Sequence, residues 1–337
     1  MSTPAIRALK ESGPGRRITL LTSSRGTEVA RLVPEVDHVI RYDPPWMKAT
    51  APRVDSGPEH AMIERLRGFD ASVIFTVYSQ SPLPAALLCH LADIPLRLAH
   101  SRENPYQLLT DWVPDPEPEH LVRHEVRRQL DLVSTVGAGV EDERLSLQVP
   151  DAAHEKVARL VQEIGLEVDR PWVVVHPGAT APSRRYPWEH FVQVAGGLGG
   201  ELGCQVVFTG TEPERELVEQ IRSLVEGPTF SLVGRLDLAE LAALLSVAPL
   251  MVSNNTGPAH VAAAVGTAVV DLYALTNPQH TPWMVRHRVL SHDVPCRNCY
   301  SSVCREGHHD CLRLVRPQQV VEAAAELLGE PEVFQPA

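Results

Sequence analysis

The segment Met251–Tyr273, which reads MVSNNTGPAHVAAAVGTAVVDLY, constrains the possible fold more than any other part of the chain. Its first apolar run ends in a polar turn, NNTG, and a second apolar run closes the segment. Pro258 stands where a helix begins, and Gly266 ends the small-residue helix between the runs. The pattern predicts a strand–turn–helix–strand unit. Free N–H groups and a positive helix terminus suit a phosphate, although an ordinary βαβ crossover predicts the same pattern.

Strands and helices alternate along both halves of the chain. With 337 residues, two domains are more natural than one core. The continuous apolar run Trp172–His176 is typical of a buried parallel strand and starts a second series. Other predicted strands lie at 17–22, 38–42, 71–76, 96–99, 205–209, 229–232 and 268–272, while 104–118 is expected to be a Pro- and acid-rich loop. We therefore expect α/β domains with parallel sheets, over residues 1–160 and 161–330.

Charge and hydropathy limit the classes of partner. The formal net charge is −11, so no broad basic field for nucleic acid is expected, and an anionic ligand needs locally placed arginines. No apolar run approaches the length of a membrane span, and no signal peptide is recognisable. The default expectation is a cytoplasmic protein.

The turn after the first strand of the second half carries paired positive charge. It reads HPGATAPSRR, in which Thr180 offers a hydroxyl and Arg184 and Arg185 offer guanidinium groups. At the end of a parallel strand these groups predict a phosphate site. The alternative is a solvated surface pair of arginines.

Two further turns follow strand ends. Glu212 lies just past a strand, where a carboxylate accepts bonds from ribose hydroxyls; alternatively it favours a helix N-terminus through the dipole. His260 lies on the first turn of its helix and close to any phosphate bound at Asn255–His260, or it is structural. The motifs GxGxxG, GxxxxGK[ST], HExxH and GxSxG are absent, which argues against a dehydrogenase, a P-loop enzyme, a zincin or a serine hydrolase.

Four of the six cysteines lie within sixteen residues of each other, at positions Cys296, Cys299, Cys304 and Cys311. The cluster is compatible with a structural zinc, with reduced thiols or with a local disulfide, and its spacing matches no common zinc module. Nothing in the pattern indicates a catalytic zinc.

Several segments together resemble glycosyltransferase family 9, the ADP-heptose:lipopolysaccharide heptosyltransferases. They read HPGATAPSRRYPWEHF, VVFTGTEPE, LVGRLDLAELAALL, SNNTGPAHVAAAVGT and CRNCYSSVCREGHHDCL. The resemblance is looser before residue 150. It implies a GT-B architecture, in which two Rossmann-like domains face a cleft, with the acceptor bound by residues 1–160 and the donor nucleotide by 161–330.

The resemblance also implies roles for single residues. Thr180 and Arg184, with Arg185 beside them, would contact the donor phosphates. Glu212 would bind the ribose, and Leu236 would lie against the adenine. The third turn would contact the diphosphate or the sugar through Asn255, Thr256, Gly257 and His260. The family often has Asp where this chain has Asn255, a change that removes a negative charge and alters contacts to the donor sugar.

The implied reaction is inverting transfer of a sugar, heptose by resemblance, from an ADP-sugar to a lipopolysaccharide-core or other glycan acceptor. It requires no metal cofactor and is compatible with peripheral contact at the inner face of the plasma membrane. The family's first strand and Gly-Asp turn, which carry its general base, precede the segment that matches Ser2-Thr3-Pro4, so no catalytic base is named. Two alternatives are a non-catalytic nucleotide-sugar-binding protein and a nucleotide-sugar epimerase.

Overall fold

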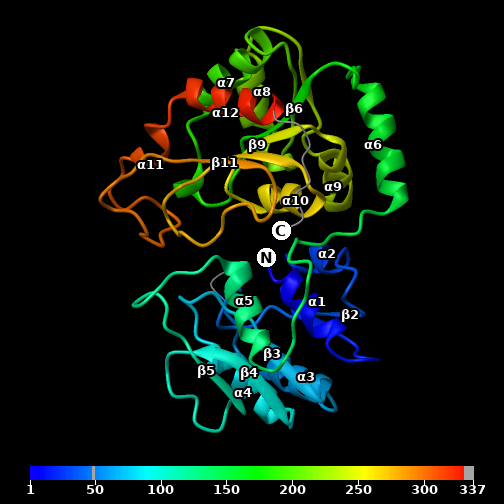
Figure 1. Ribbon diagram of the computed structural model, residues 1–337, viewed down its shortest axis with the longest axis vertical. Helices are drawn as coiled ribbons and strands as arrows, with labels where there is room; N and C mark the ends of the chain where they lie inside the picture. Colours follow the sequence, from blue (N-terminus) through cyan, green and yellow to red (C-terminus); the bar gives the residue numbers. More distant parts are fainter. Residues whose placement is uncertain (48–49, 330–337) are drawn as a thin grey trace. The chain divides into compact units, whose positions relative to one another are not determined.

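The computed structural model describes residues 1–47 and 50–329, and the chain forms two compact units, Met1–Ser146 and a second that starts at Leu147 (Figure 1). The division falls earlier than the expected 160/161 boundary. Its cause is helix α6 (Asp151–Glu163), which packs on helix α9 (Leu238–Val247) of the second unit. An ion pair joins these helices, with 2.6 Å between Lys156 Nζ and Glu240 Oε1.

The second unit is built on one six-stranded parallel sheet in the order β11-β10-β9-β6-β7-β8. In chain order the strands are β6 (Trp172–His176), β7 (Gln205–Phe208), β8 (Thr229–Ser231), β9 (Leu250–Asn254), β10 (Ala268–Leu272) and β11 (His287–Leu290). Counted from β8, the order is that of dinucleotide-binding sheets, third-second-first-fourth-fifth-sixth. The predicted parallel sheet is confirmed, and β11 is a strand that the sequence reading missed.

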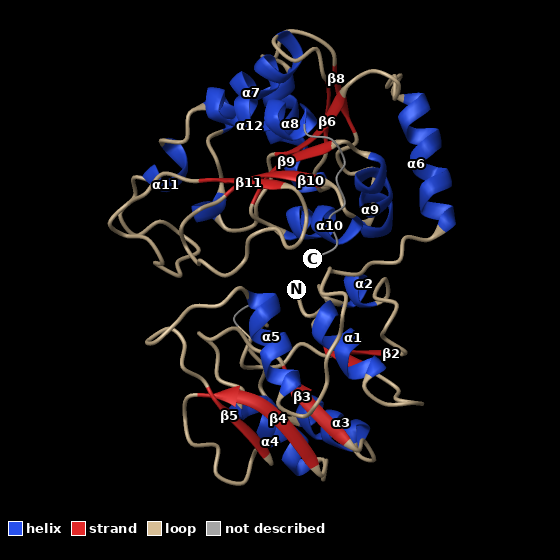
Figure 2. Ribbon diagram, in the orientation of Figure 1, coloured by secondary structure: helices blue, strands red, loops and turns tan. Residues whose placement is uncertain are grey.

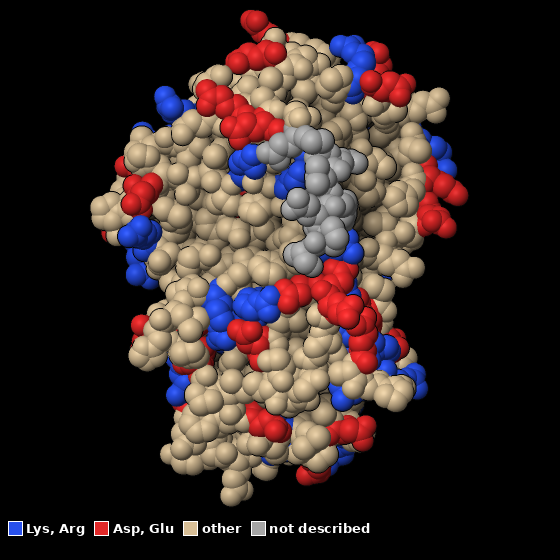
Figure 3. Space-filling view, viewed as in Figure 1, with Lys and Arg blue, Asp and Glu red and all other residues tan. Residues whose placement is uncertain are grey.

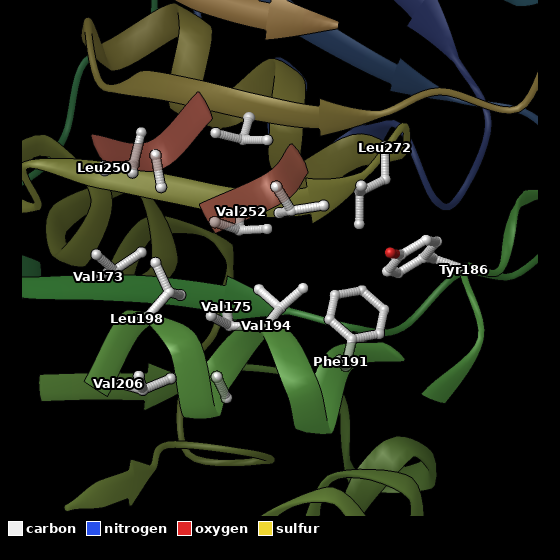
Figure 4. Packing of buried hydrophobic residues seen from close by; sticks show 14 of the residues in the cluster. Val173, Val175, Tyr186, Phe191, Val194, Leu198, Val206, Leu250, Val252 and Leu272 are labelled. Atoms are coloured by element: carbon white, nitrogen blue, oxygen red, sulfur yellow. The ribbon is translucent and has the colours of Figure 1, made fainter. Parts of the chain in front are cut away.

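Helices cover both faces of this sheet (Figure 2). One face is covered by α7 (Trp188–Gly200), α8 (Arg215–Arg222) and α12 (Pro317–Gly329), and the other by α6, α9 and α10 (Gly257–Val265). In the central strand β6, Val173 and Val175 enter the first core and Val174 the second, so all three valines are fully buried. Figure 4 shows Val194 and Leu198 of α7 packed toward these strands. Burial on two faces explains the continuous apolar run.

Helix ends in the second unit follow the local signals. Helix α10 contains Pro258 in its first turn and stops at Gly266, whose φ of 89° is left-handed and therefore favours glycine. Helix α9 starts in a capping box, because Asp237 accepts from the Glu240 N–H at 2.8 Å and Glu240 accepts from the Asp237 N–H at 2.8 Å. The predicted strand–turn–helix–strand unit is confirmed.

The first unit holds two separate parallel sheets. Strands β1 (Thr19–Thr22) and β2 (His38–Arg41) form one, and β3 (Ala71–Ile74), β4 (Leu96–Ser101) and β5 (Asp111–Pro114) form the other. Its helices are α1 (Thr3–Glu11), α2 (Thr27–Ala30), α3 (Gly57–Leu66), α4 (Leu83–Leu91) and α5 (Glu125–Ser134). The expectation of a plain loop over 104–118 was wrong, because β5 lies within it as an edge strand, the position where a strand tolerates proline.

A buried ionic network follows β5 in the first unit. The Arg128 guanidinium is fully buried and donates to both Asp115 oxygens, at 2.8 and 2.9 Å, and to Glu117 Oε2 at 2.5 Å. Its Nε donates to the Thr76 carbonyl oxygen at 3.0 Å, and Arg123 Nη2 donates to Glu117 Oε2 at 3.2 Å. The network ties α5 to the segments that follow β3 and β5.

None of the described helices is long and apolar enough to cross a bilayer.

Candidate functional site

The candidate site lies at the carboxyl ends of β6 and β9, which are neighbours in the sheet of the second unit. The chain leaves β6 toward β7 on one side and leaves β9 toward β10 on the other. Such a reversal of strand order opens a crevice between the two connections, and open α/β sheets bind ligands there. The turns predicted from the sequence, 177–185 and 254–257, are the two connections that flank this point.

Asn254, at the end of β9, fastens these two turns together. Its side chain is fully buried. Nδ2 donates to the Pro177 carbonyl oxygen at 2.8 Å, and Oδ1 accepts from the Tyr186 N–H at 3.0 Å. Both ends of the arginine-bearing turn are therefore held by one side chain from the neighbouring strand.

Arg184 closes the short helix η1 (Pro182–Arg184) within that turn and is partly exposed. Within residues 1–47 and 50–329 its guanidinium makes no hydrogen bond or ion pair. Burial raises the pKa values of Asp271 and Tyr273, and the charge of Arg184 acts against that rise. Arg185 instead braces the turn, since its Nε donates to the Ala179 carbonyl oxygen at 2.8 Å. Thr180 is exposed at the turn's apex.

The third predicted turn leads from β9 into α10. Thr256 precedes the helix, and its hydroxyl donates to the Asn254 carbonyl oxygen at 3.2 Å. Gly257 is exposed, with nothing within 4 Å of where a Cβ would lie, so the helix start is open to a ligand. His260 lies on the first turn of α10 and is half-buried.

Asn255 uses its side-chain amide nitrogen inside the protein, and its predicted contact with the donor stays a prediction. The residue is buried, and its Nδ2 donates to Asp271 Oδ2 at 2.8 Å and to the His280 carbonyl oxygen at 2.7 Å. The amide nitrogen therefore joins the end of β9 to β10 and to the loop after β10, and both of its protons are used inside the protein.

Glu212 and Leu236 lie on the connections that follow β7 and β8. Glu212 accepts two bonds from Arg215, at 2.7 and 2.6 Å, and Arg215 Nη2 also donates to the Val233 carbonyl oxygen at 2.8 Å. The guanidinium holds the pKa of Glu212 below its ordinary value. Glu212 lies against Gly234, two residues before Leu236 in the chain. Leu236 is half-buried against the core.

Glu214 is a residue of this region that the sequence reading did not select. Its Oε2 accepts from the Thr211 N–H and hydroxyl at 2.7 and 2.8 Å. Its Oε1 lies so close to Gly178 that a Cβ there would be only 1.9 Å away. The carboxylate thus lies between the carboxyl ends of β6 and β7, nearer to the crevice than Glu212. The signal was the Thr-x-x-Glu spacing of a capping box, together with a glycine in the turn after β6.

A buried row of polar side chains runs beneath the crevice. His176 of β6, Ser253 of β9 and Asp271 of β10 are register partners and therefore point to one face of the sheet. Thr209 extends the row, with 3.1 Å between its hydroxyl and His176 Nδ1. Burial lowers the pKa of His176, which keeps the imidazole neutral, and burial raises the pKa of Asp271 to about 7.

The four clustered cysteines, Cys296, Cys299, Cys304 and Cys311, are half-buried free thiols. Cys296 Sγ lies 3.6 Å from His308 Nε2, while His308 Nδ1 accepts from the Asp310 N–H at 2.9 Å, so the proton of a neutral imidazole lies on Nε2. In the described part of the chain no three His, Cys, Asp or Glu side chains are placed to share a metal ion. A structural zinc bound by these thiolates stays a prediction.

The segment that holds the cysteines also supports the arginine-bearing turn. Ser183 Oγ donates to the Ser301 carbonyl oxygen at 2.7 Å, and the Ser183 N–H donates to the Ser302 carbonyl oxygen at 3.1 Å. On the face shown in Figure 3, acidic and basic side chains are mixed over each unit, without a continuous basic surface.

Comparison with solved structures defines the class of fold. The glycosyltransferase family 9 protein of Veillonella parvula superimposes with a TM-score of 0.76 at 22% identity, over 97% of this chain and 92% of that one. The ADP-heptose lipopolysaccharide heptosyltransferase II of Escherichia coli gives 0.72 at 24% identity, over 97% and 94%. The chain therefore has the GT-B fold of these glycosyltransferases.

Comparison of sequences gives the family. The model of glycosyltransferase family 9 (heptosyltransferase) matches residues 60–309, and the chain belongs to this family. The lipopolysaccharide heptosyltransferase 2 of Salmonella typhimurium is 28% identical over 258 residues, 74% of each chain. The predicted family is confirmed, and the protein is a glycosyltransferase.

Proposed function

We propose that the protein transfers a sugar from an ADP-sugar donor to a glycan of the lipopolysaccharide core, with heptose as the transferred sugar. Family membership and the names of its relatives support the sugar and the acceptor. The observation that carries the donor site is Arg184, a partly exposed guanidinium without an ion-pair partner among the described residues, on a turn fastened to the start of α10. A lipid-linked acceptor would bring the protein to the inner face of the membrane.

The roles in donor binding follow from these positions. Arg184 and the open start of α10 at Gly257 would hold the diphosphate, with Thr180 at the rim and Arg185 keeping the turn in shape. Thr256 and His260 would face the diphosphate or the sugar. Glu214 and Glu212 are the two carboxylates available to ribose hydroxyls, and Leu236 offers an apolar contact to adenine.

The proposed chemistry is direct displacement at the anomeric carbon with inversion. A bond forms from the acceptor oxygen to that carbon, and the bond from the carbon to the diphosphate oxygen breaks. The acceptor proton passes to a general base, which is not assigned, and the negative charge gathers on the departing diphosphate. Arg184 and the α10 terminus would stabilise that charge, and no metal ion has a part in the proposal.

Calorimetric titration with ADP tests the donor site. Arg184→Ala should weaken ADP binding by about 10- to 100-fold, because one charge-assisted contact to phosphate is lost. Arg222→Ala is the matched control, since Arg222 ends α8 and bonds to Glu219 and to Thr229 at the start of β8, away from the crevice. Equal affinities in the wild type and the Arg184 variant would overturn the site.

A transfer assay with ADP-heptose and a lipopolysaccharide-core acceptor tests the activity. Glycosylated acceptor with inverted configuration is the expected product. ADP binding without any product would favour the non-catalytic binding protein, and an isomerised donor formed without acceptor would favour the epimerase.

A further inference from the structure

Asp271 carries a buried carboxyl group that has no role among the donor contacts proposed above. It is the fourth residue of β10, and its side chain is fully buried. Burying an ionised carboxylate is costly unless it is paired or hydrogen-bonded. A carboxyl group in the middle of a nucleotide-binding sheet therefore requires an explanation.

The contacts of Asp271 are incomplete. Oδ2 accepts from Asn255 Nδ2 at 2.8 Å. Oδ1 is buried and has no hydrogen-bond partner among the described residues. An ionised carboxylate has two oxygens that need donors, whereas a protonated carboxyl group leaves one oxygen as a hydroxyl. One hydrogen bond and one bare oxygen describe a group that can exist in either state.

The charge of the proposed phosphate ligand, Arg184, acts on Asp271. Burial raises the pKa values of Asp271 and of Tyr273, which follows β10 directly, and this guanidinium acts in the opposite direction. Other titratable groups on elements near Asp271 are Tyr273, His176, two strands away in the same register row, His260 on α10, which packs on β10, and His280, whose carbonyl oxygen shares the Asn255 amide. Among the described residues, Arg184 is the cation whose charge acts on Asp271.

We propose that Asp271 is a positioning residue of the donor site, which takes up a proton when a diphosphate binds Arg184. This rests on the proposed donor site. A bound diphosphate neutralises the guanidinium that favours the carboxylate and adds negative charge of its own, so the proton is drawn from solvent to Asp271. No bond of the donor is made or broken in this step. The neutral carboxyl group keeps its bond with Asn255 and so keeps the end of β9 in place.

Asp271 places a carboxyl group beside the position where the family resemblance leads us to expect Asp before Thr-Gly. The carboxyl group is absent at position 255 but present 2.8 Å behind it, on the next strand. Its charge can be switched off when the anionic donor arrives. A carboxylate on the ligand side would instead remain near the diphosphate.

Calorimetry with ADP in two buffers of different ionisation enthalpy, at about pH 7.5, measures the proton uptake. Asp271→Asn keeps an acceptor for Asn255 and removes the titration. The ionisation of ADP itself contributes equally to both proteins, so the difference isolates Asp271. If the pKa rises by one unit on binding, the wild type takes up about half a proton more per ADP than the variant. Glu219→Gln, a change on the exposed face of α8, should behave as the wild type.

The exchange variant Asn255→Asp with Asp271→Asn keeps one carboxyl and one amide in contact, and serves if the single variant does not fold. In this variant the carboxyl group lies one strand closer to the ligand. The variant should again take up a proton on binding ADP, and it should bind ADP at least threefold more weakly than the wild type. Equal proton counts in the wild type and Asp271→Asn, with ADP bound by both, would overturn this inference and leave the donor site standing. A wild type that binds no ADP would overturn both.

Discussion

Asn254 Nδ2 lies 2.8 Å from the carbonyl oxygen of Pro177, which fastens the end of β9 to the turn that follows β6. The two segments are 77 residues apart in the chain. The bond crosses the point where the strand order reverses, and it holds the turn that carries Arg184. We conclude that the shape of the candidate phosphate site depends on a residue that has no exposed atom to offer a ligand.

Asn254→Asp is expected to lower the free energy of unfolding by about 1–3 kcal/mol, because the carboxylate cannot donate to Pro177 and is itself buried. ADP affinity should fall as well, since the Arg184 turn loses one of its two hydrogen bonds with Asn254. Urea unfolding and calorimetry measure the two effects. Asn104→Asp is the control, because its Oδ1 accepts from the Tyr106 N–H in an exposed loop and the substitution keeps that acceptor. Equal losses in both variants would count against an anchoring role.

The sequence was informative where the signal is local. The valine run of β6 and the Pro258 and Gly266 signals of α10 depend on neighbours in the chain, and both elements are as expected. Asn255 shows where such reasoning ends. Its type and position fit a ligand contact, but its partner Asp271 is sixteen residues away on another strand. Only the register of β9 and β10 decides which way that amide is used.

Contacts distant in the chain also decide which of Glu212 and Glu214 lies closer to the candidate site. Both follow the end of β7 within six residues, and the chain alone does not tell which carboxylate turns toward β6. The structure turns Glu214 toward Gly178 and Glu212 toward Gly234. Arg215 decides the second contact, because it binds Glu212 and the Val233 carbonyl together.

Gly178→Ala should displace the Glu214 carboxylate, because the new Cβ would lie 1.9 Å from Oε1. The side chain can rotate away, so the cost is the loss of its bonds with Thr211, on the order of 1 kcal/mol. Glu214→Ala alone should cost the same, and the double variant no more than either single one. Chemical unfolding of the three variants measures this. Gly139→Ala, with open space around its Cβ, should be neutral. Additive losses would show that the two residues do not interact.

Asp271→Asn should stabilise the protein at pH 8 and have little effect near pH 4. The pKa of Asp271 is about 7 in the folded chain, above its ordinary value of 3.8. A group with a raised folded pKa contributes stability that is complete below the unfolded value and is lost as pH rises through the folded value. The wild type therefore loses stability between about pH 4 and pH 7, and the variant does not. Thermal unfolding at a series of pH values should show melting temperatures that diverge toward high pH, and parallel curves would contradict the raised pKa.

Arg128→Met should destabilise the first unit far more than the same change at its neighbour. Arg128 is fully buried and serves Asp115 and Glu117 together, so its removal leaves these two buried carboxylates with Arg123 as their remaining cation, at a cost of about 3–5 kcal/mol. Arg127 pairs with Glu143 at the surface, and Arg127→Met should cost less than about 1 kcal/mol. Urea unfolding followed by far-UV circular dichroism compares the two.

Neutralising the carboxylates in the Arg128 variant distinguishes two causes of the lost stability, buried negative charge and lost packing. If the buried charge dominates, Asp115→Asn and Glu117→Gln, added to Arg128→Met, should recover a large part of the lost stability, because the buried groups no longer need a cation. If packing dominates, the triple variant should be no more stable than Arg128→Met alone. Equal stability of Arg128→Met and Arg127→Met would instead show that the network is not what ties α5 to the ends of β3 and β5.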